Sequence, residues 1–233
     1  NGEMRNRDEN LAAHPRTEEE VRRHIADYYA MIAHQDAHIA RVLEALDRNG
    51  HGEDTIIVYT ADHGLGVGQH GLLGKQNLYD HSVRVPMIVA GPGVQVGAEV
   101  DEMVCLYDVF PTVCDLTGTP VPESVESRSF AGLATGASQT GRESAFSVYR
   151  DIQRMVTDGE WKLIRHYRAE SREKGVDRVQ LFHIAEDPWE LNDLSADAAH
   201  GERLRALAET MTGWMRAAGD PFESAAVLPS RSV

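Results

Sequence analysis

The residues best suited to chemistry lie between positions 59 and 86, and the first of them are the consecutive Asp62 and His63. A carboxylate oxygen and an imidazole nitrogen are both competent ligands for a divalent metal ion. Gly64 follows, and a residue without a Cβ lets the backbone turn sharply. An Asp-His pair alone is more often a cap and a turn residue than a metal site. Its interpretation therefore depends on the residues around it.

A lysine follows this pair in a glycine-rich segment. Lys75 comes after five glycines in the eleven residues 64–74, a composition that predicts a mobile backbone able to wrap a ligand. A lone lysine on a loop is normally solvated. After a metal-type pair, however, its ammonium group suits the binding of a tetrahedral oxyanion between the metal and the lysine.

The elements around these residues predict an α/β domain. Thr55–Thr60 is a short β-branched run, typical of a strand covered on both faces, and a second apolar run spans Val83–Ala90. The Asp-His pair follows the first strand, where open α/β sheets bind ligands. A helix over about 108–116, closed by Gly118, completes this part. The order of elements predicts a largely parallel sheet.

A long amphipathic helix is predicted before the first strand. Thr17 and Glu20 have the spacing of a capping box, and apolar residues then recur at steps of three and four as far as Asn49. Asp36 interrupts this apolar stripe. It is therefore predicted to be a buried, paired carboxylate or to lie where the stripe meets a cleft. The polar residues 1–16 are predicted to be irregular.

The composition changes after Pro120. Residues 122–142 are rich in Ser, Gly, Thr and Ala and predict a surface connection. Beyond them, short apolar runs between turn signals predict a small antiparallel sheet, with a helix over 203–215 and a loose tail from Asp220. The strand candidates are 144–149, 153–157, 161–166 and 179–183. We therefore predict two domains, residues 1–140 and residues 141–233.

Composition and charge limit the classes of partner. The chain has 233 residues with 23 basic and 37 acidic side chains, and a net charge of −14 argues against a nucleic-acid surface. No run of about 18 apolar residues is present, so no membrane span is predicted. Two cysteines are too few for a disulfide scaffold. The first residue is Asn1 rather than Met, from which we expect the natural N-terminus to lie upstream. The cellular compartment is left open.

The segment from Thr60 to Pro86 closely resembles a block of the type I sulfatases, which are formylglycine-dependent enzymes of the alkaline phosphatase superfamily. The helices on either side of it are similar too, and the resemblance covers residues 17 to 215. It implies an α/β fold: part of an alkaline-phosphatase-like α/β/α layered sheet, then a small antiparallel sheet with a packed helix. The matching stretches are Thr60-Ala-Asp62-His63-Gly64, Gln69-His70-Gly71-Leu-Leu-Gly74-Lys75, Leu78-Tyr79-Asp80-His81-Ser-Val-Arg84-Val-Pro86, Trp161-Lys162-Leu163 and Asp187-Pro188-Trp189-Glu190-Leu191.

The resemblance implies roles for individual residues. Asp62 and His63 match two protein ligands of the family's single divalent ion, usually calcium. Lys75 matches the lysine that holds the sulfate group of the substrate, a small-molecule or carbohydrate sulfate ester. His70 and Arg84 lie in the same block but match no assigned role. By the same comparison Asp36 becomes a structural residue of the helix.

One part of the family's machinery has no counterpart in this sequence. The nucleophile of these enzymes is a formylglycine made from the first residue of a Cys-(Pro/Ala)-Ser-Arg motif. Neither Cys105-Leu-Tyr-Asp nor Cys114-Asp-Leu-Thr matches that motif. In the family the motif lies well upstream, with two metal-binding aspartates and the histidine that protonates the leaving alcohol. We therefore expect the C-terminal portion of a sulfatase, inactive and association-prone without the N-terminal portion of the same protein.

Two alternatives stay open beside a sulfuric ester hydrolase. A phosphodiesterase or phosphonate monoester hydrolase of the same superfamily has a similar arrangement of metal and lysine, although residues 76–84 read more like a sulfatase. The other alternative is a non-catalytic, truncated paralogue that binds a sulfated ligand. The coding sequence upstream of Asn1 distinguishes them, because a Cys- or Ser-x-Pro-Ser-Arg stretch supports the sulfatase.

Overall fold

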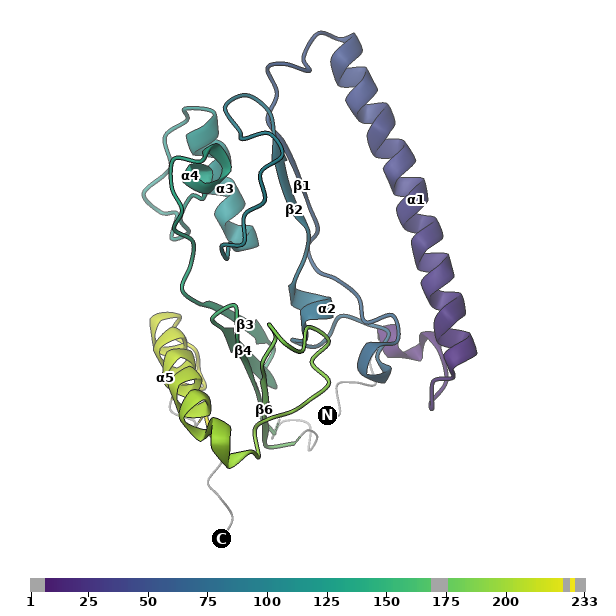
Figure 1. Cartoon of the computed structure of the whole chain (residues 1–233), viewed down its shortest axis with the longest axis vertical. Coiled ribbons are helices and arrows are strands. Elements are labelled where there is room, and N and C mark those ends of the chain that lie inside the picture. Colours follow the sequence, from purple (N-terminus) through teal and green to yellow (C-terminus); the bar gives the residue numbers. More distant parts are fainter. Residues whose placement is uncertain (1–6, 169–175, 224–226, 229–233) are drawn as a thin grey trace. The chain divides into compact units, whose positions relative to one another are not determined.

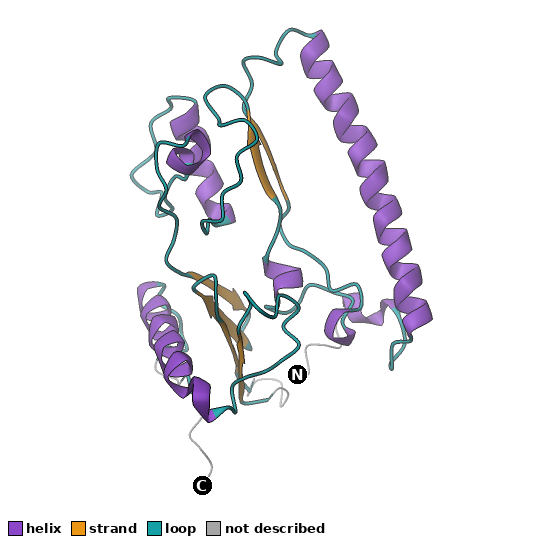
Figure 2. Ribbon diagram, in the orientation of Figure 1, coloured by secondary structure: helices purple, strands orange, loops and turns teal. Residues whose placement is uncertain are grey.

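A computed structural model of the chain describes residues 7–168, 176–223 and 227–228 (Figures 1 and 2). By their contacts the residues group into two compact units. One unit contains residues 1–16, 63–84 and 143–233, and the other contains residues 17–62 and 85–142. The division into domains 1–140 and 141–233 stays a prediction.

The long helix α1, Glu18–Arg48, begins and ends where the sequence indicates. Thr17 caps it by accepting a hydrogen bond from the Glu20 amide at 3.3 Å. However, none of its residues is buried, and Asp36 is exposed. The prediction of a buried Asp36 is therefore wrong within the described residues, because they bury no side chain of this helix. Neither α1 nor any other described helix has the length and apolar character that crossing a membrane requires.

Strands β1, Ile57–Thr60, and β2, Met87–Ala90, form an antiparallel pair in which Thr60 lies opposite Met87. The predicted parallel direction is wrong for this pair. Parallel neighbours require a long crossover, usually a helix, whereas the connection from 61 to 86 contains only the four-residue helix α2, Asp80–Val83, and a 3-10 turn. The predicted coverage of both faces of the first strand is also wrong within the described residues, since Tyr59 of β1 is 36% exposed.

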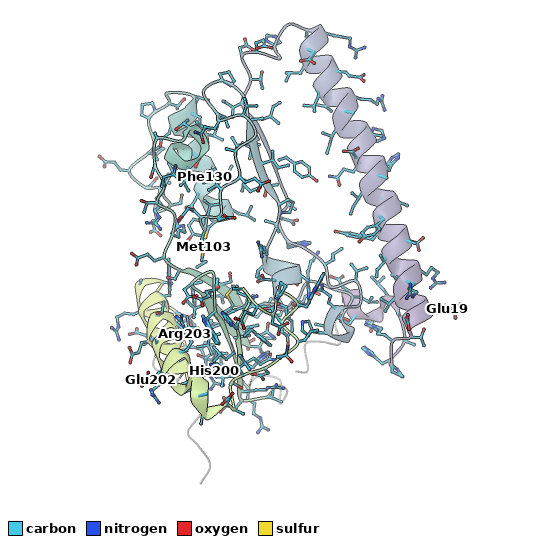
Figure 3. The ribbon with its side chains drawn as sticks, viewed as in Figure 1. Glu19, Met103, Phe130, His200, Glu202 and Arg203 are labelled. Atoms are coloured by element: carbon cyan, nitrogen blue, oxygen red, sulfur yellow. The ribbon has the colours of Figure 1, made fainter. Side chains whose placement is uncertain are left out.

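Two short helices complete the unit that contains α1. The 3-10 turn η4, Leu106–Asp108, leads into α3, Val109–Leu116, and α4, Ala131–Thr135, follows later in the chain. Gly118 follows α3 with a φ of +67°, and its N–H caps the Asp115 carbonyl. The predicted helix over 108–116 is thus confirmed. Phe130, labelled in Figure 3, is buried, as are Leu133 and Cys114.

The other unit is built on a four-stranded antiparallel sheet in the order β3-β4-β5-β6. Its strands are β3 Ala145–Tyr149, β4 Gln153–Thr157, β5 Lys162–His166 and β6 Arg178–Phe182. They agree with the predicted small sheet to within about one residue at each end. Turn signals such as Asp158-Gly159 separate these runs in the sequence, and consecutive strands joined by short connections pair as neighbours.

Helix α5, Gly201–Ala217, preceded by the 3-10 turn η6, Ala198–His200, packs on β4 and β5 of this sheet (Figure 1). Its buried residues Leu207, Met211 and Met215 join Val156, Leu163 and Leu181 in one core cluster. At its N-terminal end, Arg203 (Figure 3) lies 5.4 Å from the centre of the Trp161 ring. The prediction of a loose tail is wrong at Asp220. Its buried carboxylate pairs with Arg154 of β4 at 2.6 Å. Residues 224–226 and 229–233 of the predicted tail lie outside the described residues.

Candidate active site

The glycine-rich segment forms a closed turn rather than a slack loop. The Gly66 N–H donates to the Gly74 carbonyl at 3.0 Å, and the Gly68 N–H donates to the Leu72 carbonyl at 2.7 Å. Gly68 and Gly71 have φ values of +106° and +71°, which a glycine adopts without strain. Leu72 and Leu73 are buried below it. The predicted mobile backbone is therefore wrong, because the glycines make a tight turn that leucines anchor.

The segment before Lys75 is also held by a carboxylate from the start of the chain. Glu9 accepts the Gly74 N–H at 2.7 Å and the Leu73 N–H at 3.0 Å. Its own charge is balanced by Arg16 at 2.7 Å, and Glu9 is only 3% exposed. Glu9 belongs to the 3-10 turn η2, Arg7–Leu11, so the prediction of an irregular start is wrong there. The sequence carries no local signal for this contact, which spans more than 60 residues.

At the other end of the segment, Gly64 fits closely against α2. Its N–H donates to the Ser82 carbonyl at 2.9 Å. A Cβ at this position would lie 2.0 Å from the His81 carbonyl oxygen, so only glycine fits without a shift of the backbone. The residue that follows the Asp-His pair is thus fixed to a helix that also belongs to the recognised block.

We expect Gly64→Ala to lower the free energy of unfolding by about 1–3 kcal/mol, the usual cost of forcing extra atoms into a packed site. The shift would also break the Gly64–Ser82 hydrogen bond. Gly213→Ala is the matched control, because Gly213 lies inside α5 with no atom within 4 Å of a new Cβ. The control is expected to be neutral or to stabilise by up to about 1 kcal/mol. Urea unfolding of both variants measures the difference, and equal effects would contradict the close fit.

The predicted site residues lie at the two ends of this closed turn. The His63 Nδ1 atom is 3.0 Å from the Gly64 carbonyl oxygen. In the tautomer with the proton on Nδ1, this contact orients the ring and makes Nε2 the atom with a lone pair. Asp62 is exposed two residues after β1, and Lys75 is half-buried. The Gly66–Gly74 hydrogen bond joins the segment that follows His63 to the segment that precedes Lys75.

Three aromatic rings of this region lie against one another. The His70 ring stacks on Tyr79 with centroids 4.0 Å apart, and the His81 centroid is 5.7 Å from that of Tyr79. Both nitrogens of His81 are buried without a hydrogen-bond partner in the structure. Burial lowers the pKa of His81 to about 4, so this ring is neutral near pH 7. These rings pack the block together, and His70 and Arg84 gain no chemical role from their contacts.

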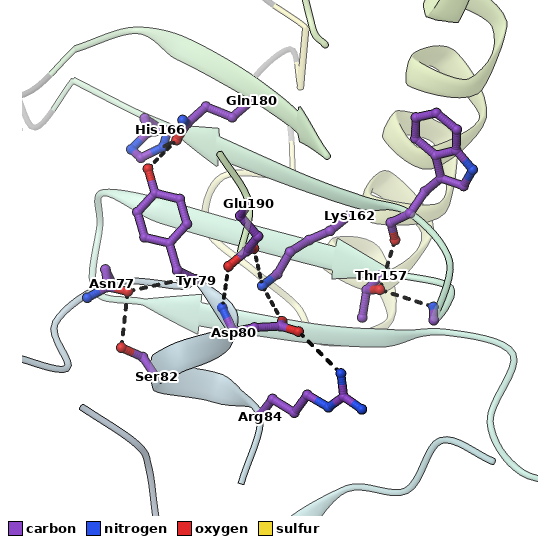
Figure 4. Close-up of polar contacts among 12 residues, drawn as sticks. Asn77, Tyr79, Asp80, Ser82, Arg84, Thr157, Lys162, His166, Gln180 and Glu190 are labelled. Carbon is purple, nitrogen blue, oxygen red and sulfur yellow. Dashed lines mark hydrogen bonds and ion pairs between the residues drawn. The ribbon is translucent and has the colours of Figure 1, made fainter. Parts of the chain in front are cut away.

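A buried chain of polar side chains extends from Tyr79 into the C-terminal sheet (Figure 4). The Tyr79 hydroxyl donates to Gln180 Oε1 at 3.0 Å, and the same oxygen lies 2.8 Å from His166 Nε2. Because an amide oxygen only accepts, His166 Nε2 must donate, and Nδ1 accepts from Gln153 Nε2 at 3.2 Å. A second proton on Nδ1 would face an N–H donor. Burial is the main reason that the pKa of His166 falls to about 4.

This arrangement predicts a loss of stability on acidification. His166 ionises in the unfolded chain near its ordinary pKa of 6.5 but stays neutral in the fold, so protons bind preferentially to the unfolded state. We expect this group to contribute a loss of about 2 kcal/mol between about pH 7.5 and about pH 5. Urea unfolding across that range measures the slope, and His166→Gln should remove this part of it. An unchanged slope in the variant would contradict a neutral, buried His166.

No group of three or more His, Cys, Asp or Glu side chains that could hold a metal ion occurs within residues 7–168, 176–223 and 227–228. The described chain therefore offers Asp62 and His63 as a pair of candidate ligands rather than a full coordination shell. Calcium takes about six to eight oxygen-type ligands, so the pair by itself would bind it weakly.

Comparisons with known proteins identify the family of the chain. The sulfatase family model matches residues 3–119, and the model of the C-terminal region of N-sulphoglucosamine sulphohydrolase matches residues 68–216. Arylsulfatase K of Mus musculus is 31% identical over 195 residues, covering 78% of this chain and 34% of that protein. The choline-sulfatase of Rhizobium meliloti (strain 1021) is 32% identical over 186 residues, covering 77% of this chain and 34% of that protein.

Solved structures extend the likeness to the fold. A structure of a 2-O GAG sulfatase superimposes with a TM-score of 0.76 at 28% identity, covering 89% of this chain and 46% of that one. The phosphonate monoester hydrolase of Agrobacterium radiobacter gives 0.75 at 28% identity, covering 89% and 44%. The chain belongs to the sulfatase family of the alkaline phosphatase superfamily and has its α/β fold. It spans about a third of the length of the curated relatives it matches.

Proposed function

We propose that the protein is a sulfatase, a sulfuric ester hydrolase that cleaves a sulfate monoester with the help of one divalent metal ion. The observation that carries the proposal is the segment from Asp62 to Lys75, whose backbone is held by hydrogen bonds at Gly64 and Gly74 and which lies within the matched family region. Lys75 is proposed to donate hydrogen bonds to the sulfate oxygens and to balance their charge, as a catalytic and substrate-binding residue.

Asp62 and His63 are proposed as metal ligands, with calcium as the expected ion. The fit rests on the exposed Asp62 carboxylate and on the His63 ring, which the Gly64 carbonyl orients. When bound, a divalent cation would polarise the sulfate group as a Lewis acid. The remaining ligands and the formylglycine nucleophile are proposed to come from residues upstream of this chain, since neither Cys105 nor Cys114 has the required sequence context.

Exposed apolar surface supports the N-terminal portion of the same protein as a partner. Ile32 and Leu43 of the apolar stripe on α1 are 43% and 39% exposed, and Ile88 on β2 is 58% exposed. A helix with an apolar stripe normally gains most of its stability by packing that stripe. We propose that the upstream portion packs on these surfaces, and that this chain alone is inactive and prone to association.

The substrate is proposed to be a carbohydrate or other small-molecule sulfate ester. The 2-O GAG sulfatase with the same fold acts, by its description, on a glycosaminoglycan. The net charge of −14 means that an anionic substrate must be held by local cations such as Lys75 and the metal.

The test compares this chain with the full-length protein. We expect the full-length protein to hydrolyse an aryl sulfate or a sulfated monosaccharide, and to lose that activity when a chelator removes the metal and regain it with calcium. The isolated chain should show no turnover. Metal-dependent turnover by the isolated chain would overturn the proposed division of the site. A full-length protein without activity on any sulfate ester would overturn the proposed sulfatase activity.

A second candidate is a phosphodiesterase or phosphonate monoester hydrolase. The likeness to the Agrobacterium radiobacter enzyme favours it, because fold and identity match as well as those of the sulfatase structure. Aryl phosphonate and phosphodiester substrates in the same assay distinguish the two. A third candidate, a non-catalytic paralogue that binds a sulfated ligand, predicts binding of sulfated sugar without turnover of any of these esters by the full-length protein.

A further inference from the structure

Helix α2 lies between the site segment and the C-terminal sheet. On one side, Gly64 fits against the α2 backbone through the Ser82 carbonyl, as described above. On the other side, the first residue of α2, Asp80, faces the buried Lys162 of β5 (Figure 4). The position of α2 therefore affects where the backbone after His63 lies.

Asp80 is held through both its side chain and its main chain. The Lys162 ammonium lies 2.5 Å from Asp80 Oδ1 and 2.7 Å from Glu190 Oε1. The other oxygen of Glu190 accepts the Asp80 N–H at 2.6 Å. Lys162 is 0% and Glu190 3% exposed, so their contact lies out of the solvent, and the Asp80 side chain is 17% exposed. One lysine and one glutamate thus fix the start of α2 in position and in orientation.

Such an arrangement is costly as a means of stability alone. Removing charges from water carries a large desolvation cost, and apolar side chains of similar volume often stabilise a protein as well or better. Glu190 also has a φ of +55°, an uncommon conformation for a residue other than glycine. Its neighbours Trp189 and Leu191 are 61% and 71% exposed, so the backbone turns inward only at Glu190. Ion pairs and hydrogen bonds from Lys162 and Glu190 fix the orientation of Asp80, which apolar packing alone does not do.

We propose that Lys162 and Glu190 are positioning residues of the site: they fix Asp80 and α2, and through Gly64 they hold the backbone that carries His63. The C-terminal sheet is then part of the machinery that aligns the metal and sulfate groups. What this alignment serves rests on the proposed function, but the mechanical link itself can be measured without activity.

The experiment measures hydrogen exchange of the Gly64 amide in this chain, since that N–H is released only when Gly64 separates from Ser82. The variants are Lys162→Met and Glu190→Gln. Arg154→Met is the matched control. Arg154 lies on β4, the strand next to β5, and its comparably buried ion pair is with Asp220 rather than with a residue of α2. Exchange is compared at matched global stability, which is adjusted with urea. Both Asp80-linked variants should raise Gly64 exchange by roughly tenfold or more over the control.

Lys162→Met leaves two carboxylates without their cation and could unfold the chain. The double variant Lys162→Met/Glu190→Leu removes the lysine together with the buried glutamate, so it is expected to recover stability. Asp80 still lacks both its ion pair with Lys162 and the acceptor for its N–H. Fast Gly64 exchange in a folded double variant supports the positioning role. Wild-type exchange in that variant, or an equal rise in Arg154→Met, would overturn it.

The outcome is separable from that of the proposed function. If Gly64 exchange responds as expected while the full-length protein cleaves no sulfate ester, the positioning role stands and the proposed function fails. If the full-length protein is an active sulfatase and Gly64 exchange does not respond, the positioning role fails alone.

Discussion

Replacing Lys75 with methionine in the full-length protein is expected to lower kcat/KM for a sulfate ester by about 10²–10³-fold, the usual effect of removing one preorganised donor to a developing oxyanion. Methionine keeps the length of the side chain and removes the ammonium group. Glu9 and the Gly66–Gly74 hydrogen bond hold the backbone just before Lys75, and the Asn77 N–H donates to the Lys75 carbonyl at 2.8 Å, so the variant should keep the shape of the segment. Steady-state kinetics with an aryl sulfate measure the loss.

Arg22→Met is the control for the change in charge. Arg22 pairs with Glu18 on the surface of α1, where both side chains are at least 75% exposed, and such pairs contribute little. It removes one positive charge, as Lys75→Met does, and should leave kcat/KM unchanged. Equal losses in the two variants would point to overall charge as the cause. No loss in Lys75→Met would remove Lys75 from the site.

The four-stranded sheet and α5 could be predicted because their signals are local. The four strands of its sheet are short β-branched or aromatic runs, and the connections after β3 and β4, residues 150–152 and 158–161, are short enough to impose antiparallel pairs. The apolar spacing of α5 is likewise contained within the helix itself. Local propensity and long-range packing agree for these strands and this helix, so reading the sequence is sufficient for them.

The direction of β1 and β2 could not be read in the same way. A β-branched run is equally compatible with a parallel or an antiparallel neighbour, and the decision depends on the connection. The glycines of 64–74 present the same difficulty, because the residue that permits a flexible loop also permits a tight turn. Leu72 and Leu73 were the available signal for a turn anchored in a core.

A sequence motif identifies the candidate site residues but not the residues that hold them in place. Asp62, His63 and Lys75 are adjacent enough in the sequence to be read as one block, and whether they act in catalysis stays a prediction. The groups that hold the block are far away along the chain, such as Glu9 and Lys162, and a lone acid or lysine carries no mark of its partner. A charged residue is usually solvated, so its burial emerges only from the fold.

Arg142→Met is expected to lower the stability of the unit that contains α3 by about 3–5 kcal/mol, because it leaves a buried carboxylate without its cation. Asp108 is 2% exposed and accepts hydrogen bonds from Arg142 Nε at 2.7 Å and from the Cys105 N–H at 3.0 Å. The hydrogen bond to Asp108 raises the pKa of Arg142, so the guanidinium stays charged at neutral pH. Urea unfolding gives the free energy.

Thiol labelling shows whether the loss is confined to this unit. Cys114 is 8% exposed in α3, so it reacts only when the helix opens, and mass spectrometry separates it from the more accessible Cys105. Labelling of Cys114 should accelerate in Arg142→Met. Arg128→Met is the control, since that side chain is exposed while its backbone N–H still reaches Asp108; a change within about 0.5 kcal/mol is expected. Equal effects of the two substitutions would show that the Asp108–Arg142 pair does not hold α3 in place, and its charges would then contribute no more than those on the surface.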